Sequence, residues 1–237
     1  MQPLLVLFDI DGTLVDTAGA GRRSIERAFV ELWRVDPTTA AGRRVPYAGR
    51  TDPQIFRALA RAFAVDPDRY RAGEAALVEL YLAALVEEMA RPDPRRRVLP
   101  GVAALLEGLC GTPGVHLGLV TGNLERGARA KLAPFGLSDY FPAGGFGSDH
   151  VERASIARVA HHRLSRHAGI DFPPSRVVVV GDTEHDVACA RANGFRALAV
   201  ATGTIPSETL RRAGPDALFS TFDERPDAVR AALGLPS

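Results

Sequence analysis

The sequence predicts an α/β protein in which helices cover both faces of a parallel sheet and an all-helical unit is inserted near the start of the chain. Four short apolar segments, residues 3–8, 116–120, 176–180 and 195–200, are rich in β-favouring residues and end in small or polar ones. Helical periodicity lies beside them, which is typical of βαβ units. Residues 17–97, by contrast, contain no β-rich run. Together these observations favour a Rossmann-like core with an inserted helical unit.

The first strand is expected at residues 3–8, because an apolar run without charge fits a strand buried on both faces of a parallel sheet. The inserted unit should consist of amphipathic helices, since its apolar residues keep helical spacing. The residues with this spacing are Ile25, Phe29, Leu32 and Trp33; Ile55, Leu59 and Phe63; and Leu77, Leu80, Leu85 and Met89. We therefore expect residues 1–16 and 98–237 to form the α/β core and residues 17–97 the insertion, joined by two flexible stretches of chain.

Composition limits the classes of partner. The chain has 237 residues, and its formal net charge of +1 gives no reason to expect nucleic acid or an anionic membrane as a partner. Two cysteines are too few for a disulfide framework and favour a reducing compartment. Neither a leader before the first strand nor an apolar stretch of membrane-spanning length is recognisable. We expect a cytoplasmic monomer or homodimer whose partner is a small molecule.

Two acidic residues stand where the first strand ends. Asp9 and Asp11 share one face of the extended chain, because alternate residues of a strand point the same way. Burying them costs on the order of several kcal/mol each unless a cation compensates, so a divalent metal site is the leading interpretation. The alternative is a turn or helix cap, which Gly12 and Thr13 would also suit. Ligands bind beyond the carboxyl ends of strands in open α/β sheets, which favours the metal site.

The strand at residues 116–120 also ends in polar groups. Thr121, Gly122 and Asn123 precede a helix expected at residues 124–135, with Asn123 as its N-cap. The Thr121 hydroxyl and the backbone N–H groups at this helix start would bind phosphate oxygens. A plain capping turn is the alternative.

The strand at residues 176–180 leads into another acidic pair. Asp182 stands at its tip, and Asp186 follows one helical turn later. Asp182 could complete an oxygen-rich Mg²⁺ shell with Asp9 and a backbone carbonyl. Asp186 could hold the metal's waters or simply favour the N-terminus of the helix.

These segments together resemble the haloacid dehalogenase-like (HAD) hydrolase superfamily over the whole chain. Residues 9–16 (DIDGTLVD) are similar to its first motif, residues 121–123 (TGN) to its second, and Gly181, Asp182 and Asp186 to its fourth. The helical insertion resembles the cap of the phosphoglycolate phosphatase and β-phosphoglucomutase branch, and residues 49–52 (GRTD) its substrate-loop signature. The resemblance implies phosphoryl transfer through an aspartyl phosphate.

The chain departs from this family at the third motif, a lysine that should stand some thirty residues before the fourth. No lysine occurs there, and Arg153 occupies the region. Arginine keeps the positive charge and can clamp phosphate oxygens, although its reach differs. The alternative is a solvated helix charge. Lys131, the only lysine of the chain, is expected on the wet face of the helix after the second motif.

The resemblance and the residues together predict a mechanism. Asp9 would attack phosphorus, while Asp11, kept protonated by its crowding beside Asp9, would protonate the leaving alkoxide and then activate water. Arg50 would dock a second anionic group of the substrate, because Asp52 and Pro53 suit an N-cap and first helical residue beside it; a surface arginine in a loop is the alternative. The predicted catalytic residues are Asp9, Asp11, Thr121 and Arg153; the metal ligands Asp9, Asp11, Asp182 and Asp186; and the phosphate or substrate contacts Gly12, Gly122, Asn123 and Arg50.

The function expected is a Mg²⁺-dependent phosphatase for a small phosphorylated metabolite such as phosphoglycolate. A sugar-phosphate mutase of the β-phosphoglucomutase type could use the same two aspartates. A catalytically silent phosphate-binding relative is a further alternative, which the departure at the third motif suggests. Haloalkanoate dehalogenation is disfavoured because it has no use for Asp11, and phosphonate cleavage because it needs a lysine in the cap, which has none.

Overall fold

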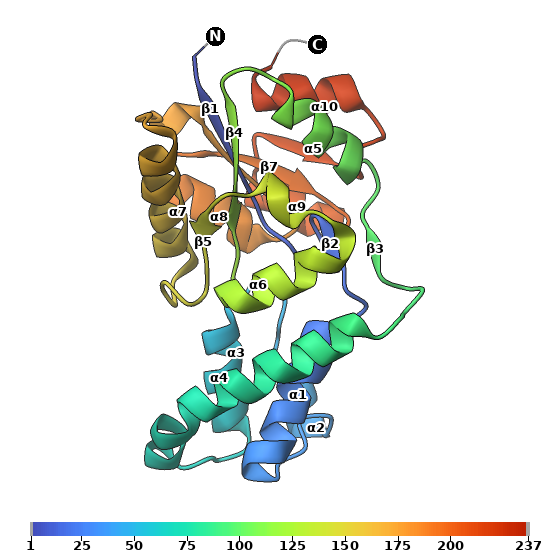
Figure 1. Cartoon of the computed structure of the whole chain (residues 1–237), viewed down its shortest axis with the longest axis vertical. Helices are drawn as coiled ribbons and strands as arrows, with labels where there is room; N and C mark the ends of the chain where they lie inside the picture. Colours follow the sequence, from blue (N-terminus) through green and yellow to red (C-terminus); the bar gives the residue numbers. More distant parts are fainter. Residues whose placement is uncertain (1, 236–237) are drawn as a thin grey trace.

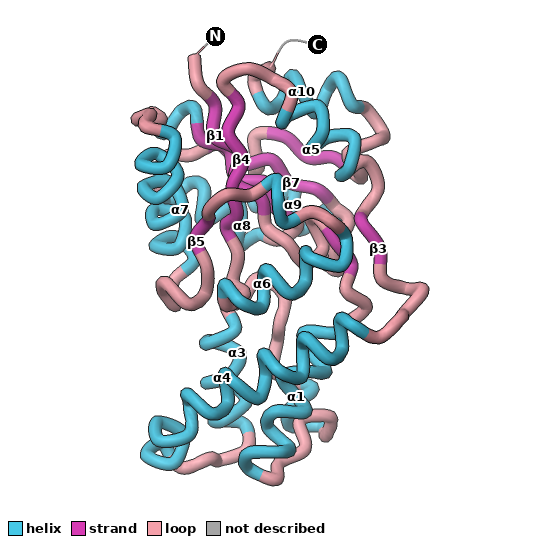
Figure 2. The backbone as a smooth tube through the Cα atoms, in the orientation of Figure 1, coloured by secondary structure: helices cyan, strands magenta, loops and turns pink. Residues whose placement is uncertain are grey.

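The computed structural model describes residues 2–235 and contains a six-stranded sheet in the order β5-β4-β1-β6-β7-β8 (Figures 1 and 2). All of its strand pairs are parallel. The strands are β1 (Leu4–Phe8), β4 (Val115–Val120), β5 (Gly144–Gly145), β6 (Val177–Gly181), β7 (Arg196–Val200) and β8 (Ala217–Phe219). The four strands expected from the sequence are confirmed, and the two short edge strands β5 and β8 are additional. The α/β class with a parallel Rossmann-like sheet is therefore confirmed.

Alternate residues of each central strand face two separate hydrophobic clusters, one on each side of the sheet. Leu4, Val6 and Phe8 pack into the first cluster, whereas Leu5 and Leu7 pack into the second. The helices of the first face are α5 (Val102–Cys110), α6 (Glu125–Leu132) and α10 (Pro226–Leu233); those of the second are α7 (Arg153–Ala168), α8 (Glu184–Ala192) and α9 (Ser207–Ala213). Short 3₁₀ helices, η1 (Ala133–Phe135), η2 (Ser138–Tyr140) and η3 (Pro174–Arg176), lie in the connections. Burial on both faces explains why β1 carries no charged residue.

Four helices form a second group with a hydrophobic cluster of its own (Figure 1). They are α1 (Ala20–Trp33), α2 (Ala40–Arg43), α3 (Asp52–Ala62) and α4 (Pro67–Ala90), and we call them the four-helix insertion. The apolar residues of α1, α3 and α4 meet one another around buried aromatic side chains such as Phe29, Trp33 and Tyr81. Helix α4 also contacts α6, so the insertion packs against the core. None of the described helices has both the length and the apolar character needed to cross a bilayer.

The start of α3 differs from the sequence prediction. Thr51 is its N-cap and forms a capping box with Gln54, so that Asp52 is already the first helical residue. The Asp52 side chain is thereby left free to bind elsewhere, and it lies buried against the core.

The two stretches that lead into and out of the insertion pair with each other instead of running separately. They form β2 (Val15–Asp16) and β3 (Arg97–Val98), an antiparallel ladder in which Val15 faces Val98. Arg97 also forms an ion pair with Asp16 at 3.2 Å. The connection between insertion and core is therefore a short hydrogen-bonded hinge.

Candidate active site

A pocket of about 650 Å³ lies between the carboxyl ends of the central strands and the four-helix insertion. The core side supplies the acidic residues and the loop after β4, and the insertion supplies polar residues of α1, of α3 and of the loop before α3. The lining residues used below are Asp9, Asp11, Gly12, Thr121, Gly122, Asn123, Lys131, Arg153, Asp182 and Gly203 from the core, and Arg22, Tyr47, Arg50 and Asp52 from the insertion. The pocket is thus where strand ends of an open α/β sheet bind ligands.

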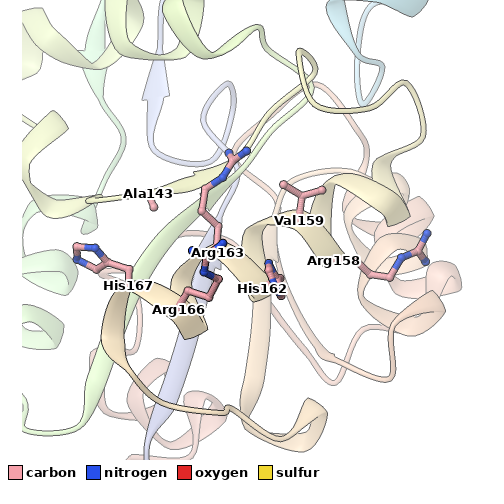
Figure 3. Close-up of a pocket in the computed structure, with 7 residues that line it drawn as sticks. All are labelled: Ala143, Arg158, Val159, His162, Arg163, Arg166 and His167. Carbon is pink, nitrogen blue, oxygen red and sulfur yellow. The ribbon is translucent and has the colours of Figure 1, made fainter.

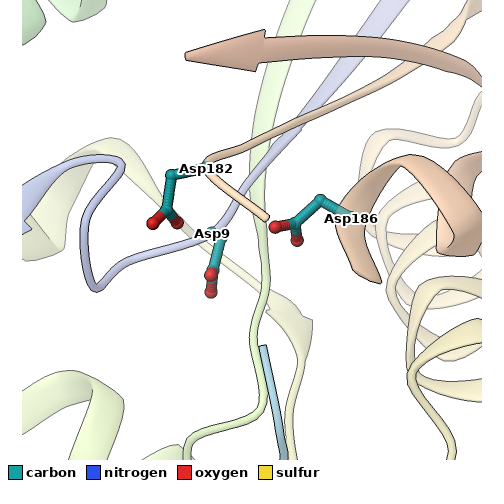
Figure 4. Close-up of side chains that lie close together, drawn as sticks. All are labelled: Asp9, Asp182 and Asp186. Carbon is teal, nitrogen blue, oxygen red and sulfur yellow. The ribbon is translucent and has the colours of Figure 1, made fainter. Parts of the chain in front are cut away.

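Three buried carboxylates lie close together, and two of them, Asp9 and Asp182, line this pocket (Figure 4). Each of Asp9, Asp182 and Asp186 offers an oxygen, and these oxygens all lie within 4.8 Å of one another. Thr13 donates a hydrogen bond to Asp182 at 3.1 Å, and the Thr183 hydroxyl donates one to Asp186 at 2.7 Å. The structure therefore groups three of the four predicted metal ligands, whereas the side chain of Asp11 bonds to other partners.

Burial and mutual repulsion make ionisation of this acidic cluster unfavourable. Burial, opposed by the charge of Arg153 and assisted by that of Asp186, raises the pKa of Asp9 to about 6. Burial and the neighbouring carboxylates also raise the pKa of Asp182 well above its ordinary value. Crowded buried carboxylates of this kind fit a hard divalent cation such as Mg²⁺, which prefers oxygen ligands and offsets their mutual repulsion.

Two glycines let the backbone approach Asp182. Gly12 has a φ of +78°, and a Cβ there would lie 2.3 Å from the Asp182 carboxylate. A Cβ on Gly203, in the loop after β7, would lie only 1.7 Å from the same oxygen. Both positions therefore require glycine, and Gly203 belongs to the site although the sequence did not single it out.

Arg153, the first residue of α7, lies inside the acidic cluster. Its guanidinium forms an ion pair with Asp9 at 2.9 Å and a second with Asp186, and its side chain is only 9% exposed. It is therefore not a solvated helix charge. Its Nε is buried without a hydrogen-bond partner among the described residues, so the guanidinium retains a free donor.

The loop after β4 is arranged differently from the expected capping turn. Asn123 is not the N-cap of α6; its Nδ2 donates to Asp11 and to Thr121, both at 2.8 Å. Leu124 is the N-cap residue, and its N–H donates to the Asp52 carboxylate of the insertion at 2.9 Å, whereas the first helical N–H, that of Glu125, donates to the Ser148 hydroxyl at 3.3 Å. The start of α6 is therefore held by side chains distant in sequence, Asp52 and Ser148, which no local pattern could indicate.

Gly122 is the point where the insertion touches this loop. Its carbonyl accepts a hydrogen bond from the Asp52 N–H at 2.8 Å, and a Cβ on Gly122 would lie 2.4 Å from the Arg50 carbonyl. Tyr81 of α4 adds a hydrogen bond to the Asp52 carboxylate at 3.1 Å. Burial raises the pKa of Asp52 to about 6, so this contact between insertion and core contains a titratable group.

The prediction that Lys131 lies on a wet face is wrong. Its side chain is buried, and its Nζ lies 2.6 Å from Asp11 and 2.6 Å from Asn123. The prediction failed because the exposed face of a core helix was assumed, whereas the insertion covers α6 here. Spacing carried a signal: Leu124, Ala128 and Lys131 keep one helical stripe, and the first two are apolar.

The ionisation of Asp11 also differs from the expectation. Burial favours its neutral form, but the charge and hydrogen bond of Lys131, with hydrogen bonds from Asn123 and Thr17, leave the pKa of Asp11 below its usual value. Without a substrate, Asp11 is thus held as a carboxylate, and its side chain remains 42% exposed to the pocket.

The insertion presents cationic and hydroxyl groups to the opposite side of the pocket. Arg50 is partly buried in the loop before α3. Arg22 stacks over the Tyr47 ring at 4.8 Å and forms an ion pair with Glu26. The Tyr47 hydroxyl is buried without a partner among the described residues. This side of the pocket could therefore bind a polar or anionic part of a ligand.

A second hollow, of about 700 Å³, lies along α7 and shares no residue with this pocket (Figure 3). It is lined by Ala143, Arg158, Val159, His162, Arg163, Arg166 and His167. Arg163 is already paired with Asp149 and with the Gly144 carbonyl. The hollow contains no carboxylate and is not part of the candidate site.

The raised pKa values predict how pH and Mg²⁺ affect stability. The pKa of Asp9 is about 6 in the folded protein and about 4 in the unfolded chain. Between about pH 4 and pH 6, the folded metal-free protein therefore holds a proton on Asp9 that the unfolded chain has released. Metal-free stability should therefore fall as pH rises through about 6. Mg²⁺ requires the ionised cluster, so the increase in melting temperature that it causes should grow over the same interval. Thermal melts with EDTA or with excess Mg²⁺ across this range test the prediction; an increase independent of pH would contradict it.

The chain is similar in sequence to known hydrolases and phosphatases. The family model of the haloacid dehalogenase-like hydrolases matches residues 6–191. The chain is 32% identical to "Probable phosphatase IndB" of Dickeya dadantii, an alignment that covers 100% of this chain and 97% of that protein. It is 29% identical to "Tyrosine-protein kinase PtkA" of Mycobacterium tuberculosis over 99% of this chain and 74% of that protein. It is 30% identical to the phosphoglycolate phosphatase of Pseudomonas syringae pv. tomato over 85% of this chain and 70% of that protein.

Solved structures share the fold over the full length. The crystal structure of CbbY from Rhodobacter sphaeroides in complex with phosphate superposes with a TM-score of 0.72 and 23% identity, covering 99% of this chain and 100% of that chain. The match to the family model includes β4, β5, β6 and the positions of Asp9, Asp182 and Asp186. The chain therefore belongs to the haloacid dehalogenase-like hydrolases and is a phosphatase-like member of that family.

Proposed function

We propose that the protein is a Mg²⁺-dependent phosphatase that hydrolyses a small, anionic phosphomonoester of the phosphoglycolate type. The observation that carries this proposal is the placement of Asp9 between the clustered acids and the Arg153 guanidinium. Bound Mg²⁺ would be held by Asp9, Asp182 and Asp186 and would offset the repulsion between carboxylates and the phosphate dianion. That repulsion is about 1 kcal/mol per charge pair at about 4 Å in water and several times larger in a shielded pocket.

Asp9 is the proposed nucleophile. One of its oxygens attacks phosphorus, the bond from phosphorus to the ester oxygen breaks, and an aspartyl phosphate forms. Arg153 takes up charge on the transferring oxygens through its free N–H donors, and Thr121 and the backbone around Gly12 and Gly122 complete the phosphate contacts.

Asp11 is the proposed proton carrier. It is already ionised in the free protein, which is the form needed to take a proton from the water that attacks the aspartyl phosphate. To protonate the leaving alkoxide it must first take up a proton, and the approach of a phosphate dianion favours that form. Asp11 gives this proton to the leaving alkoxide. Asp11 then takes a proton from the water that attacks the aspartyl phosphate.

Residues 17–97 are proposed to act as a cap over residues 1–16 and 98–237. Asp52 joins the two parts through Gly122 and Leu124, and the β2–β3 ladder forms the hinge. A closed cap keeps water from the reacting groups and places Arg50, Arg22 and Tyr47 against the distal end of the substrate.

Separate measurement of two products tests the proposed function. A set of phosphorylated small metabolites, with phosphoglycolate and hexose 1-phosphates included, is incubated with the purified protein and Mg²⁺. A phosphatase releases inorganic phosphate from its substrate, whereas a mutase forms an isomer with little release. Absence of both products, with p-nitrophenyl phosphate also intact, would overturn the proposal and favour a binding protein without activity.

Arg50→Ala is expected to change recognition of the substrate rather than the chemical step. Loss of the guanidinium should raise KM for a phosphomonoester that carries a second anionic group by about tenfold, since a charged hydrogen bond contributes about 1.5 kcal/mol or more. KM for an uncharged alkyl phosphate should change little. Steady-state kinetics on both substrates test this, and equal changes would exclude the role. Arg57 lies on α3 and does not line the pocket, so Arg57→Ala is the control and should leave KM unchanged for both substrates.

A further inference from the structure

We infer that Lys131 is a positioning residue that fixes the Asp11 carboxyl group where it can exchange a proton with the leaving oxygen of the substrate. The inference rests on the proposed phosphatase function and adds to it a residue from a helix that none of the recognised motifs includes.

The hydrogen bonds of Lys131 determine the orientation of Asp11. Its Nζ lies 2.6 Å from Asp11 Oδ2, and Asn123 Nδ2 donates to the same oxygen at 2.8 Å. Lys131 also donates to Asn123 Oδ1 at 2.6 Å, so the amide cannot rotate without losing both bonds. The Thr17 hydroxyl binds the other carboxylate oxygen weakly, at 3.4 Å. One oxygen of Asp11 is therefore fixed and the other faces the pocket.

The insertion is shaped to admit the lysine. Gly21 of α1 is buried, and a Cβ there would lie 2.9 Å from the Lys131 Nζ. Gly21 is the second residue of α1, and a side chain at this position would crowd the Lys131 amine. The glycine allows the charged Nζ to remain between core and insertion.

Lys131 acts as a cation in this position and not as a nucleophile. Burial opposes its charge, but Asp11 and Asp52 raise the pKa of Lys131 above its ordinary value. A protonated amine with two acceptors cannot form a Schiff base. Its effect on the reaction is therefore indirect, through the carboxyl group that it holds.

Substrates that differ in their need for an acid distinguish positioning from a general structural role. Departure of an alkoxide requires a proton, whereas departure of p-nitrophenolate does not. For Lys131→Met we expect kcat/KM to fall about 100-fold with an alkyl phosphate and at most about threefold with p-nitrophenyl phosphate, because positioned acid catalysis contributes about 10²-fold or more. We use kcat/KM because it reports steps up to the first irreversible one.

A second variant and a matched control complete the experiment. Gly21→Ala leaves Lys131 in the chain but displaces it, and alanine favours the helix, so this variant should fold and show a smaller loss confined to the alkyl phosphate. Arg129→Met removes a charge from the same helix outside the pocket. It should leave kcat/KM unchanged with both substrates.

The outcomes separate the two proposals. An equal loss with both substrates, a change in KM alone, or an unchanged kcat/KM would overturn the role of Lys131. If Lys131→Met does not fold, Gly21→Ala decides by the same criteria. If the unaltered protein hydrolyses neither substrate, the phosphatase function itself fails.

Discussion

Replacing Asp9 with asparagine is expected to abolish phosphate release, with a loss of about 10⁴-fold or more in kcat, as for other catalytic nucleophiles. The amide cannot attack phosphorus, and it offers a poorer ligand to a cation shared with Asp182 and Asp186. The fold should persist, because removal of a carboxylate whose pKa burial raises also removes the cost of ionising it. Phosphate release measures the loss of activity, and circular dichroism and thermal melts measure whether the fold persists.

Two further variants make the result for Asp9 decisive. Asp9→Ala cannot revert to aspartate by deamidation and should be equally inactive. Asp149→Asn removes a carboxylate that pairs with Arg163 outside the pocket and should retain activity. Turnover by Asp9→Ala near that of the unaltered protein would exclude Asp9 as the nucleophile.

Arg153→Ala is expected to reduce both stability and activity. It leaves Asp9 and Asp186 buried beside each other without their guanidinium partner, and breaking a buried ion pair costs about 3–5 kcal/mol. Loss of the donors to the transferring oxygens should lower kcat by about 10²–10³-fold. Excess Mg²⁺ should restore much of the melting temperature but not kcat, because a cation can neutralise the carboxylates without replacing the phosphate donors. Denaturant titrations and kinetics with and without Mg²⁺ test this.

Arg153→Lys tests whether the charge alone is sufficient at this position. Lysine restores the residue type of the family's third motif, and we expect most of the stability to return with a smaller loss of kcat than for alanine. Recovery of neither quantity would show that the forked geometry of arginine is needed here. Arg158→Ala, on the outer face of α7, is the control for loss of an arginine from this helix.

The sequence predicted those features of the fold that depend on short-range patterns. Continuous apolar runs identified the central strands, and a change from strand to helical texture identified the insertion. The edge strands β5 and β8 were missed because two glycines and a three-residue segment carry no β-rich pattern of their own. Their pairing is imposed by neighbouring strands.

In the site, too, the residues that follow short-range patterns were predicted, and those placed by contacts between distant segments were not. Asp9 and Asp182 follow strands directly, and Asp186 lies in the first turn of the helix after β6, so their meeting at one edge of the sheet could be anticipated from topology. Lys131 and Asp52 reach the pocket because insertion and core pack together. The helical spacing of Lys131 with Leu124 and Ala128 indicated its burial but not its partners, and no local pattern indicated the contacts of Asp52. Asn123 was predicted as the N-cap of α6, but Leu124 occupies that position and its N–H binds Asp52 from the insertion.

The isolation of Lys131 has a practical consequence for work with the protein. It is the chain's only lysine, so the one side-chain primary amine lies between α1 and α6 and not on the surface. Amine-coupling chemistry used for biosensor chips, dyes or cross-linkers therefore finds no exposed lysine side chain on the folded protein. Any reagent that does attach to a lysine would report that the two halves of the molecule had separated.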